Sequence, residues 1–208
     1  MPAKKLFYSS IIILFLLCGL FFYTYNHTES TFLYYVLISF VTFLYHLLIR
    51  FFLGGIGNLL TIKLPNLNSF LFKKHSWEDS FYKKIKLKKW KHKQLTFDPS
   101  AFDFNIHSLQ EIKHSMVKSE VVHILCIIGS FSSIFFCYIT GWNHLCIFLI
   151  TALFASLFDL SLVFTQRYNR FRIERYELMK ENVAWSYWTH PHMQASAGGS
   201  TVTGDTTA

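Results

Sequence analysis

Four apolar segments of this sequence are each long enough to cross a bilayer as a helix. They cover about Leu6–Tyr25, Phe32–Phe52, Val121–Thr140 and Cys146–Thr165, and a helix needs about 20 apolar residues to cross the hydrocarbon core. A soluble chain of 208 residues would have to bury all four in one small core, which the surface-to-volume ratio of such a domain argues against. We therefore expect an all-α membrane protein whose four transmembrane helices form two hairpins.

The basic residues lie on one side of this arrangement. The connectors within the hairpins, Asn26–Thr31 and Gly141–Leu145, contain none of the 20 Lys and Arg residues. These residues lie instead in Met1–Lys5, between Arg50 and Lys118, and from Arg167 onward. Because cytoplasmic loops collect Lys and Arg, the pattern predicts that both termini and the middle segment face the cytoplasm.

We interpret residues 1–193 as a single integral membrane domain. A basic cytoplasmic interfacial segment, 53–120, would join the hairpins, and a cytoplasmic helix, 166–186, would follow the fourth span. The first span is expected to remain as a signal anchor, because its apolar run is longer than that of a secretory signal. Residues 194–208 are rich in Gly, Ser, Thr and Ala, which is typical of a disordered tail or the remnant of a tag.

The middle segment contains a basic run from Lys84 to Lys93. Its first part, Lys84–Lys88, alternates with period two, which favours a short extended segment, whereas Ser108–Lys118 is expected to be a helix leading into the third span. The formal net charge of +8 adjoins membrane spans, so it indicates anionic lipids or a phosphorylated substrate rather than nucleic acid. The run itself fits either an electrostatic anchor to the inner leaflet or a phosphate-binding patch for a donor such as coenzyme A.

Glu120 and His123 lie at the start of the third span. Residues at i and i+3 share one face of a helix, and a carboxylate that orients an imidazole makes it a better base for a hydroxyl nucleophile. The alternative is a polar pair at a helix end. Di-iron bundles need two Glu-x-x-His pairs, and the chain has one such pair in its spans, so no metal site is predicted. The four cysteines are interpreted as packing residues.

Asp159 and the string Gln166–Arg170 form a second polar group, on the fourth span. An ionisable residue inside a span usually faces a partner or a cavity, and Asp159 and Gln166 are two helical turns apart on one face. They are therefore expected to line a polar track, with headgroup anchoring as the alternative for the string. His46 and Arg50, at the end of the second span, are interpreted as an interfacial cap.

Lys88–Lys93, Glu120–His123 and Gln166–Arg170 together resemble a family of small bacterial membrane proteins, the glycosyl-4,4'-diaponeurosporenoate acyltransferases. The resemblance covers about Trp77–Arg172 and implies transfer of a fatty acyl group to a sugar hydroxyl of a glycolipid-like acceptor. The chain departs from the family pattern at several positions. Phe171 stands where the family has Pro, Asp159 and Ser161 stand where it has Asn and Pro, and Lys118-Ser119 stands where it has Arg-Ala. The acceptor is therefore open between a carotenoid glycoside and another lipid or glycolipid alcohol.

These observations together predict a multi-pass acyltransferase of the bacterial inner membrane. It would use an acyl-CoA-type donor as co-substrate and no bound cofactor. His123 would act as general base, oriented by Glu120, while Arg167 and Arg170 would bind the donor phosphate or the developing oxyanion. The predicted substrate-binding residues are Gln166, Arg167, Tyr168, Asn169, Arg170, Arg172, Asp159, Trp90, Lys88 and Lys91.

Two other functions fit parts of the pattern. A non-catalytic protein that binds lipid or scaffolds a complex would use the same polar residues as anchors. A small transporter subunit would place Asp159 in a polar pathway, although the absence of a repeat makes this the weaker alternative. Membrane lipids, an acyl donor and a lipid or glycolipid acceptor are the expected partners; acyl chain length and oligomeric state do not follow from the sequence.

Overall fold

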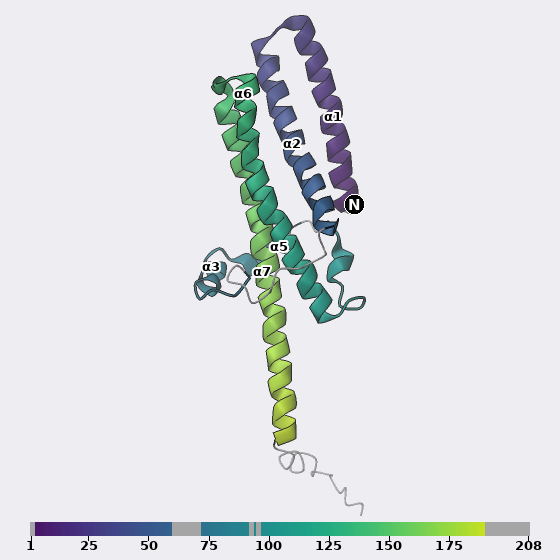
Figure 1. Cartoon of the computed structure of the whole chain (residues 1–208), viewed down its shortest axis with the longest axis vertical. Helices are drawn as coiled ribbons and strands as arrows, with labels where there is room; N and C mark the ends of the chain where they lie inside the picture. Colours follow the sequence, from purple (N-terminus) through teal and green to yellow (C-terminus); the bar gives the residue numbers. More distant parts are fainter. Residues whose placement is uncertain (1–2, 60–71, 92–93, 95–96, 190–208) are drawn as a thin grey trace, which may run out of the picture. The chain divides into compact units, whose positions relative to one another are not determined.

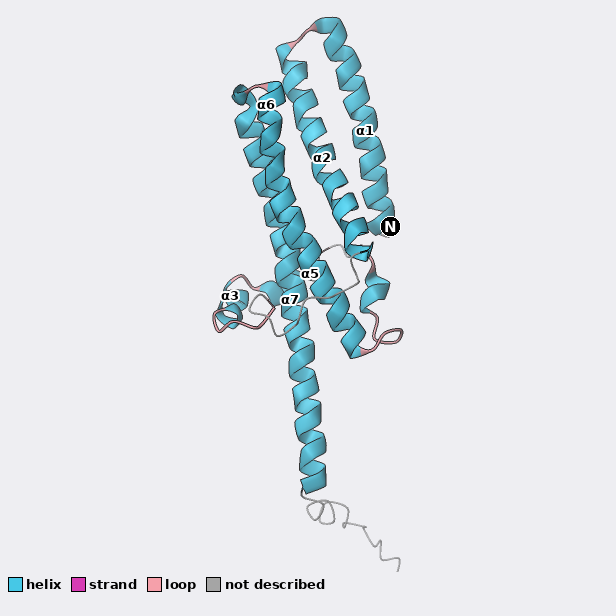
Figure 2. Ribbon diagram, viewed as in Figure 1, coloured by secondary structure: helices cyan, strands magenta, loops and turns pink. Residues whose placement is uncertain are grey.

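The computed structural model describes residues 3–59, 72–91, 94 and 97–189, and all its regular elements are helical. The long helices are α1 (Ala3–Thr28), α2 (Thr31–Leu59), α5 (Leu109–Phe131) and α7 (Leu145–Thr189) (Figures 1 and 2). The predicted all-α fold is confirmed. The tail proposed at 194–208 lies outside the described residues. The short elements are α3 (Glu78–Lys84), α4 (Leu87–Trp90), α6 (Cys137–Thr140) and the 3-10 helices Pro99–Phe102, Ser132–Phe136 and Trp142–His144.

Four helical stretches are apolar and long enough to cross a membrane, which confirms a multi-pass membrane protein. They are Ala3–Thr28, Thr31–Ile56, Leu109–Thr140 and Trp142–Lys180, and each contains one of the predicted spans. α1 has no buried residue, and it exposes large apolar side chains such as Phe15 and Leu16. An exposed apolar face of this extent fits contact with lipid.

The chain packs as two units, 1–170 and 171–208. α7 passes from the first unit to the second after Arg170. In the second unit, residues 171–189 are described, and they are the helical continuation of α7. All contacts of the site discussed below lie within the first unit.

α1 and α2 form the first hairpin (Figure 1). Glu29, with a φ of 47°, makes the turn between them. Aromatic pairs hold the two helices together. Phe21 stacks on Phe40 with ring centroids 5.2 Å apart, and Tyr25 contacts Tyr34 at the same separation, 5.2 Å.

α2 packs closely against α5 at Gly129. A Cβ atom at this position would lie 2.5 Å from Cδ1 of Ile49, so a larger residue would require the Ile49 side chain to move. The Tyr45 hydroxyl donates a hydrogen bond to the Gly129 carbonyl at 2.9 Å. Small residues at helix contacts in membranes allow this kind of close approach, which here brings the end of α2 beside α5.

The third span is not one continuous α-helix. α5 ends at Phe131 and continues as the 3-10 helix Ser132–Phe136 before α6. The Ser132 hydroxyl donates to the Gly129 carbonyl and the Ser133 hydroxyl to the Ser130 carbonyl. Serine hydroxyls that bond back to the preceding turn compete with the helical pattern and bend helices. A buried apolar cluster of Ile38, Cys137 and Phe148 joins α2 to α6 and α7 in this part of the bundle.

The middle segment differs from the prediction at Lys84–Lys88. We expected an extended stretch, and that prediction was wrong. α3 ends at Lys84, Lys86 takes a φ of 52°, and α4 begins at Leu87. Leu87 is fully buried, so its burial overrides the alternating pattern of lysines. The predicted helix before the third span is confirmed, and α5 begins at a capping box made by Ser108 and Glu111.

Candidate active site

A histidine, an aspartate and an arginine from three helices meet at one point of the first unit. The Nδ1 atom of His123, on α5, lies 3.0 Å from Oδ1 of Asp159, on α7. The Nη2 atom of Arg50, on α2, lies 2.5 Å from Oδ2 of the same carboxylate, and its Nε atom lies 3.3 Å from Oδ1. Asp159 is fully buried, and the side chain of His123 is 22% exposed.

Arg50 explains how the bundle tolerates a buried aspartate. A charge inside a membrane protein is costly unless a partner compensates it. Besides Asp159, the Arg50 guanidinium donates to the backbone carbonyls of His46, at 2.6 Å, and Ala155, at 3.0 Å. The guanidinium thus joins α2 to α7 and neutralises the carboxylate. His123 is the most exposed member of the group, with 22% of its side chain exposed against 14% for Arg50.

The arrangement is suited to proton transfer. When Nδ1 of His123 carries the proton, it donates to Asp159, and Nε2 is then the ring nitrogen that can accept a proton. A buried carboxylate on Nδ1 fixes the tautomer and the orientation of an imidazole base and stabilises the imidazolium that forms. The three residues therefore have the arrangement of a general base and its supporting carboxylate.

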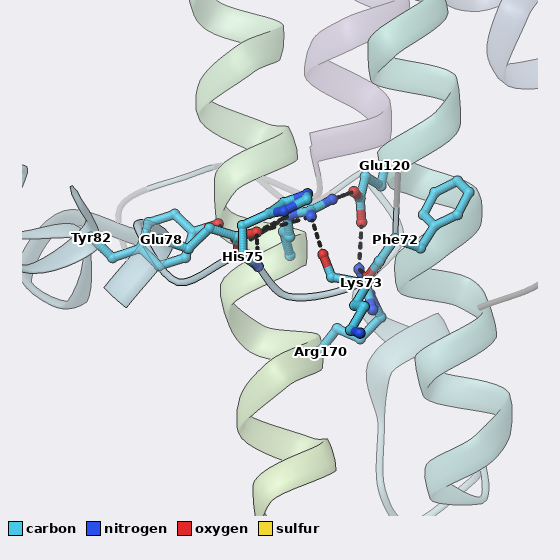
Figure 3. Close-up of polar contacts among 8 residues, drawn as sticks. Phe72, Lys73, His75, Glu78, Tyr82, Glu120 and Arg170 are labelled. Carbon is cyan, nitrogen blue, oxygen red and sulfur yellow. Dashed lines mark hydrogen bonds and ion pairs between the residues drawn. The ribbon is translucent and has the colours of Figure 1, made fainter. Parts of the chain in front are cut away.

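Four charged side chains from α3, α5 and α7 contact one another and form a second group. Arg167 donates to Glu78 through Nη2, at 2.9 Å, and to Glu120 through Nη1, at 2.7 Å. Arg170 lies 3.3 Å from the other oxygen of Glu120. Figure 3 shows Glu78 approaching from the α3 side and Glu120 from the α5 side. Two carboxylates and two guanidinium groups make the group neutral, and both carboxylates are buried.

The protein environment of Glu78 favours its charged form. Burial by itself would raise the pKa of this carboxyl, but hydrogen bonds from Arg167, the His75 backbone and the Tyr82 hydroxyl outweigh it and hold the pKa below its usual value. Burial, and then the Glu78 carboxylate, raise the pKa of Tyr82. Tyr82 therefore stays a neutral donor, 2.9 Å from Glu78.

The same arginines hold the chain before α3 against α7. Arg167 donates to the Lys73 carbonyl at 2.8 Å, and Arg170 donates to the Phe72 carbonyl at 2.9 Å (Figure 3). Arg170 is 1% exposed. Through these hydrogen bonds the two arginines hold the segment before α3 in place.

Further contacts tie Lys91 and Gln94 to α7. Lys91 donates to the Asn169 side chain at 2.6 Å, and its ammonium lies 4.9 Å from the ring centroid of Tyr168. Gln94 donates to the Ser161 hydroxyl at 2.9 Å. The described part of the middle segment therefore packs along the stretch of α7 that begins near the Asp159 carboxylate.

Several predicted site residues come together, but in different pairs from those expected. Glu120 was predicted to orient His123, and this pairing was wrong. Both oxygens of Glu120 face Arg167 and Arg170, while Asp159 is the partner of His123. The reason is the register of α5 against α7. Glu120 lies beside the turns of α7 that carry Arg167 and Arg170, whereas His123, one turn further along α5, lies beside Asp159.

The remaining predicted site residues do not gather at one place. Tyr168, Asn169 and Lys91 contact one another, whereas Trp90 donates its indole N–H to the Ile85 carbonyl within the middle segment. Lys88 is exposed, and Gln166 is half-buried. Arg172 belongs to the second unit. A polar track from Asp159 to Gln166 thus stays a prediction.

Two residues of the site were missed as partners by the sequence reasoning. Arg50 was interpreted as an interfacial cap and is instead the counter-ion of Asp159. Glu78 was not singled out, although the acidic pair Glu78-Asp79 close to a basic run is a signal that could have identified it. Among the described residues, no group of three or more His, Cys, Asp or Glu side chains has the arrangement of a metal site.

Comparison with known proteins identifies the region that carries this geometry. The family model for glycosyl-4,4'-diaponeurosporenoate acyltransferase matches residues 68–177, more than half of the chain. The matched region includes Glu78, Glu120, His123, Asp159 and Arg167, but not Arg50. No curated protein and no solved structure matched the chain.

Proposed function

The chain belongs to the glycosyl-4,4'-diaponeurosporenoate acyltransferase family, and we propose that it esterifies a sugar hydroxyl of a carotenoid glycoside or a similar glycolipid, with acyl-CoA as donor. Membership makes it an acyltransferase of carotenoid biosynthesis. The one-sided distribution of Lys and Arg supports a reaction at the cytoplasmic face of the bacterial inner membrane, with both termini on that side. An acyl-CoA is delivered from the cytoplasm, so this face suits the donor.

The observation that carries the proposal is the contact between His123 and Asp159, 3.0 Å across two helices. In the proposed reaction, Nε2 of His123 takes the proton of the acceptor hydroxyl while the hydroxyl oxygen attacks the thioester carbonyl. The C–S bond then breaks, and the imidazolium returns the proton to the leaving thiolate. Asp159 stabilises the imidazolium between these steps, and Arg50 holds the Asp159 carboxylate in place through its ion pair. General acid–base catalysis of this kind contributes roughly 100- to 10,000-fold to a rate.

The contacts of Arg167 and Arg170 change the proposed mode of donor binding. Both guanidinium groups are held by Glu78 and Glu120, so they are poor candidates for binding a phosphate. Exposed lysines of α3 and α4 suit that role better, because an exposed cation can meet an anionic donor without breaking a buried pair. The lysines concerned are Lys83, Lys84, Lys86, Lys88 and Lys89, all exposed.

Reconstitution separates this proposal from a non-catalytic scaffold and from a transporter subunit. The purified protein in lipid vesicles is given labelled acyl-CoA outside and a glycosylated carotenoid or glycolipid in the bilayer. The proposal predicts a covalent ester of the acceptor, detected by mass spectrometry, together with free coenzyme A in equal amount. Vesicles that contain the protein but yield no ester under these conditions, with several glycolipid acceptors, would contradict it.

A further inference from the structure

Three buried polar side chains in the bundle interior have no side-chain hydrogen bond to any residue that the structure describes. His46 on α2 is 3% exposed, Ser130 on α5 is fully buried, and Ser156 on α7 is 8% exposed. Among the described residues, no hydrogen-bond partner reaches either ring nitrogen of His46 or the hydroxyl oxygens of Ser130 and Ser156. Buried polar groups are almost always hydrogen-bonded, because an unsatisfied one keeps the cost of its lost hydration. Four such atoms need an explanation.

Other hydroxyls in the same helices show what is unusual about these serines. The hydroxyl of Thr42 donates to the carbonyl one turn before it, that of Ile38, at 2.7 Å, and Thr151 donates to Ile147 at 2.8 Å. Such back-bonding to the preceding turn is the ordinary way for a helix in a membrane to satisfy Ser or Thr. Ser130 and Ser156 do not use it, so their hydroxyls remain available to a ligand.

The contacts of the neighbouring turns bring the three residues to one level of the bundle. Arg50 bonds the carbonyls of both His46 and Ala155, which sets His46 opposite the residue before Ser156. Tyr45, the residue before His46, bonds the carbonyl of Gly129, the residue before Ser130. We call His46, Ser130 and Ser156 the buried polar layer.

This buried polar layer lies close to the proposed base. His46 is one helical turn from Arg50, and Ser156 is three residues from Asp159, which is about 5 Å along the helix axis. A molecule bound at the layer would therefore be near the group formed by Arg50, Asp159 and His123. The layer lies further into the bundle than that group, because α2 runs from His46 towards Arg50 and α7 from Ser156 towards Asp159.

We propose that the buried polar layer binds hydroxyl groups of the acceptor that are not themselves acylated, and so makes the enzyme selective for a polyhydroxylated, sugar-bearing acceptor. This inference rests on the proposed function. A neutral imidazole offers one donor and one acceptor, and each serine hydroxyl offers both. A carbonyl oxygen of a ligand can only accept a hydrogen bond, whereas a sugar hydroxyl can both donate to the acceptors and accept from the donors of these side chains. His46 lies outside the matched family region, whereas Ser130 and Ser156 lie inside it.

The test compares two acceptors in the reconstituted enzyme: a glycosylated lipid and a long-chain alcohol with a single hydroxyl. His46→Phe removes both ring nitrogens and keeps an aromatic ring, while His46→Gln keeps a donor and an acceptor. We expect His46→Phe to raise KM for the glycosylated lipid about tenfold, the equivalent of one lost hydrogen bond. KM for the single alcohol, KM for the donor and the pH profile of kcat should stay unchanged. His46→Gln should restore KM to within about threefold.

The matched control is His27→Phe, the same substitution at an exposed histidine of α1, which should alter neither KM. An unchanged KM for the glycosylated lipid in His46→Phe would overturn the proposal, as would an equal rise for both acceptors. If His46→Phe does not fold, Ser130→Ala and Ser156→Ala serve instead, and an unchanged KM in both overturns the proposal. A wild-type protein that forms no ester at all would refute the proposed function instead.

Discussion

The imidazole of His123 and the carboxylate of Asp159 face each other across α5 and α7, with Nδ1 and Oδ1 3.0 Å apart. The two residues belong to different spans of the second hairpin, and Arg50 of the first hairpin completes the group. The contact thus depends on the packing of three helices. The role of this contact in acyl transfer and the stability of the surrounding ion pairs can be tested separately.

Two substitutions of Asp159 separate the orientation of His123 from its electrostatic support. Asp159→Asn keeps an oxygen that can accept from Nδ1. Asp159→Ala removes the acceptor altogether. We expect kcat to fall about tenfold in the first variant and about 100-fold or more in the second. Initial rates at saturating donor and acceptor measure both, and equal rates in Asp159→Ala and wild type would contradict the proposed role.

Glu78→Gln should destabilise the protein by about 3–5 kcal/mol, because it breaks the ion pair between the buried Glu78 carboxylate and Arg167. The measurement is thermal unfolding in detergent, followed by circular dichroism. The matched control is Asp79→Asn, one residue along, where an exposed carboxylate lies 2.6 Å from Lys74. A surface ion pair of this kind contributes about 0–1 kcal/mol, so similar losses in the two variants would disprove the structural role of Glu78.

Acid should weaken the same contact. The pKa of Glu78 is lower in the folded chain than its usual value, since hydrogen bonds and Arg167 outweigh the effect of burial. A carboxyl with a depressed folded pKa contributes stability above its unfolded pKa, about 4.3, and loses it as the pH falls through the folded value. The unfolding temperature of the wild type should therefore fall between about pH 5 and pH 3. Glu78→Gln should show a smaller decrease, and identical pH profiles would contradict this explanation.

The fold was largely predictable, because hydrophobic length determines membrane spans almost independently of packing. The four apolar runs lie within four helices of sufficient length. The prediction failed where packing decides the local structure. Lys84–Lys88 alternates like a strand, but the burial of Leu87 determines a helix from that residue.

The sequence allowed a prediction of which residues belong to the site, but not of which residues contact each other. His123, Asp159, Glu120 and Arg167 could be identified because polar residues at span ends and inside spans are rare and costly. Which carboxylate meets which base depends on the register of α5 against α7, and the sequence carries no direct signal of that register. Arg50 illustrates the same limit, since its role depends on how α2 packs against α7.

The lysines of α4 should act through long-range attraction. In the double variant Lys88→Ala and Lys89→Ala we expect a several-fold higher KM for acyl-CoA at low salt, and a smaller difference at about 0.5 M salt, because ions screen exposed charges. Thermal stability should stay close to that of the wild type, since both side chains are exposed. Lys5→Ala, at an exposed lysine of α1, is the control. A salt-independent difference would argue against electrostatic capture of the donor.

The most direct test of the account is acyl transfer by His123→Gln in lipid vesicles. Glutamine keeps a polar side chain that can bond to Asp159 but cannot act as a base near neutral pH. The account predicts that kcat falls about 100-fold or more, while the unfolding temperature and KM for acyl-CoA stay close to the wild-type values. Full acyl transfer by a folded His123→Gln protein would contradict the assignment of His123 as the base.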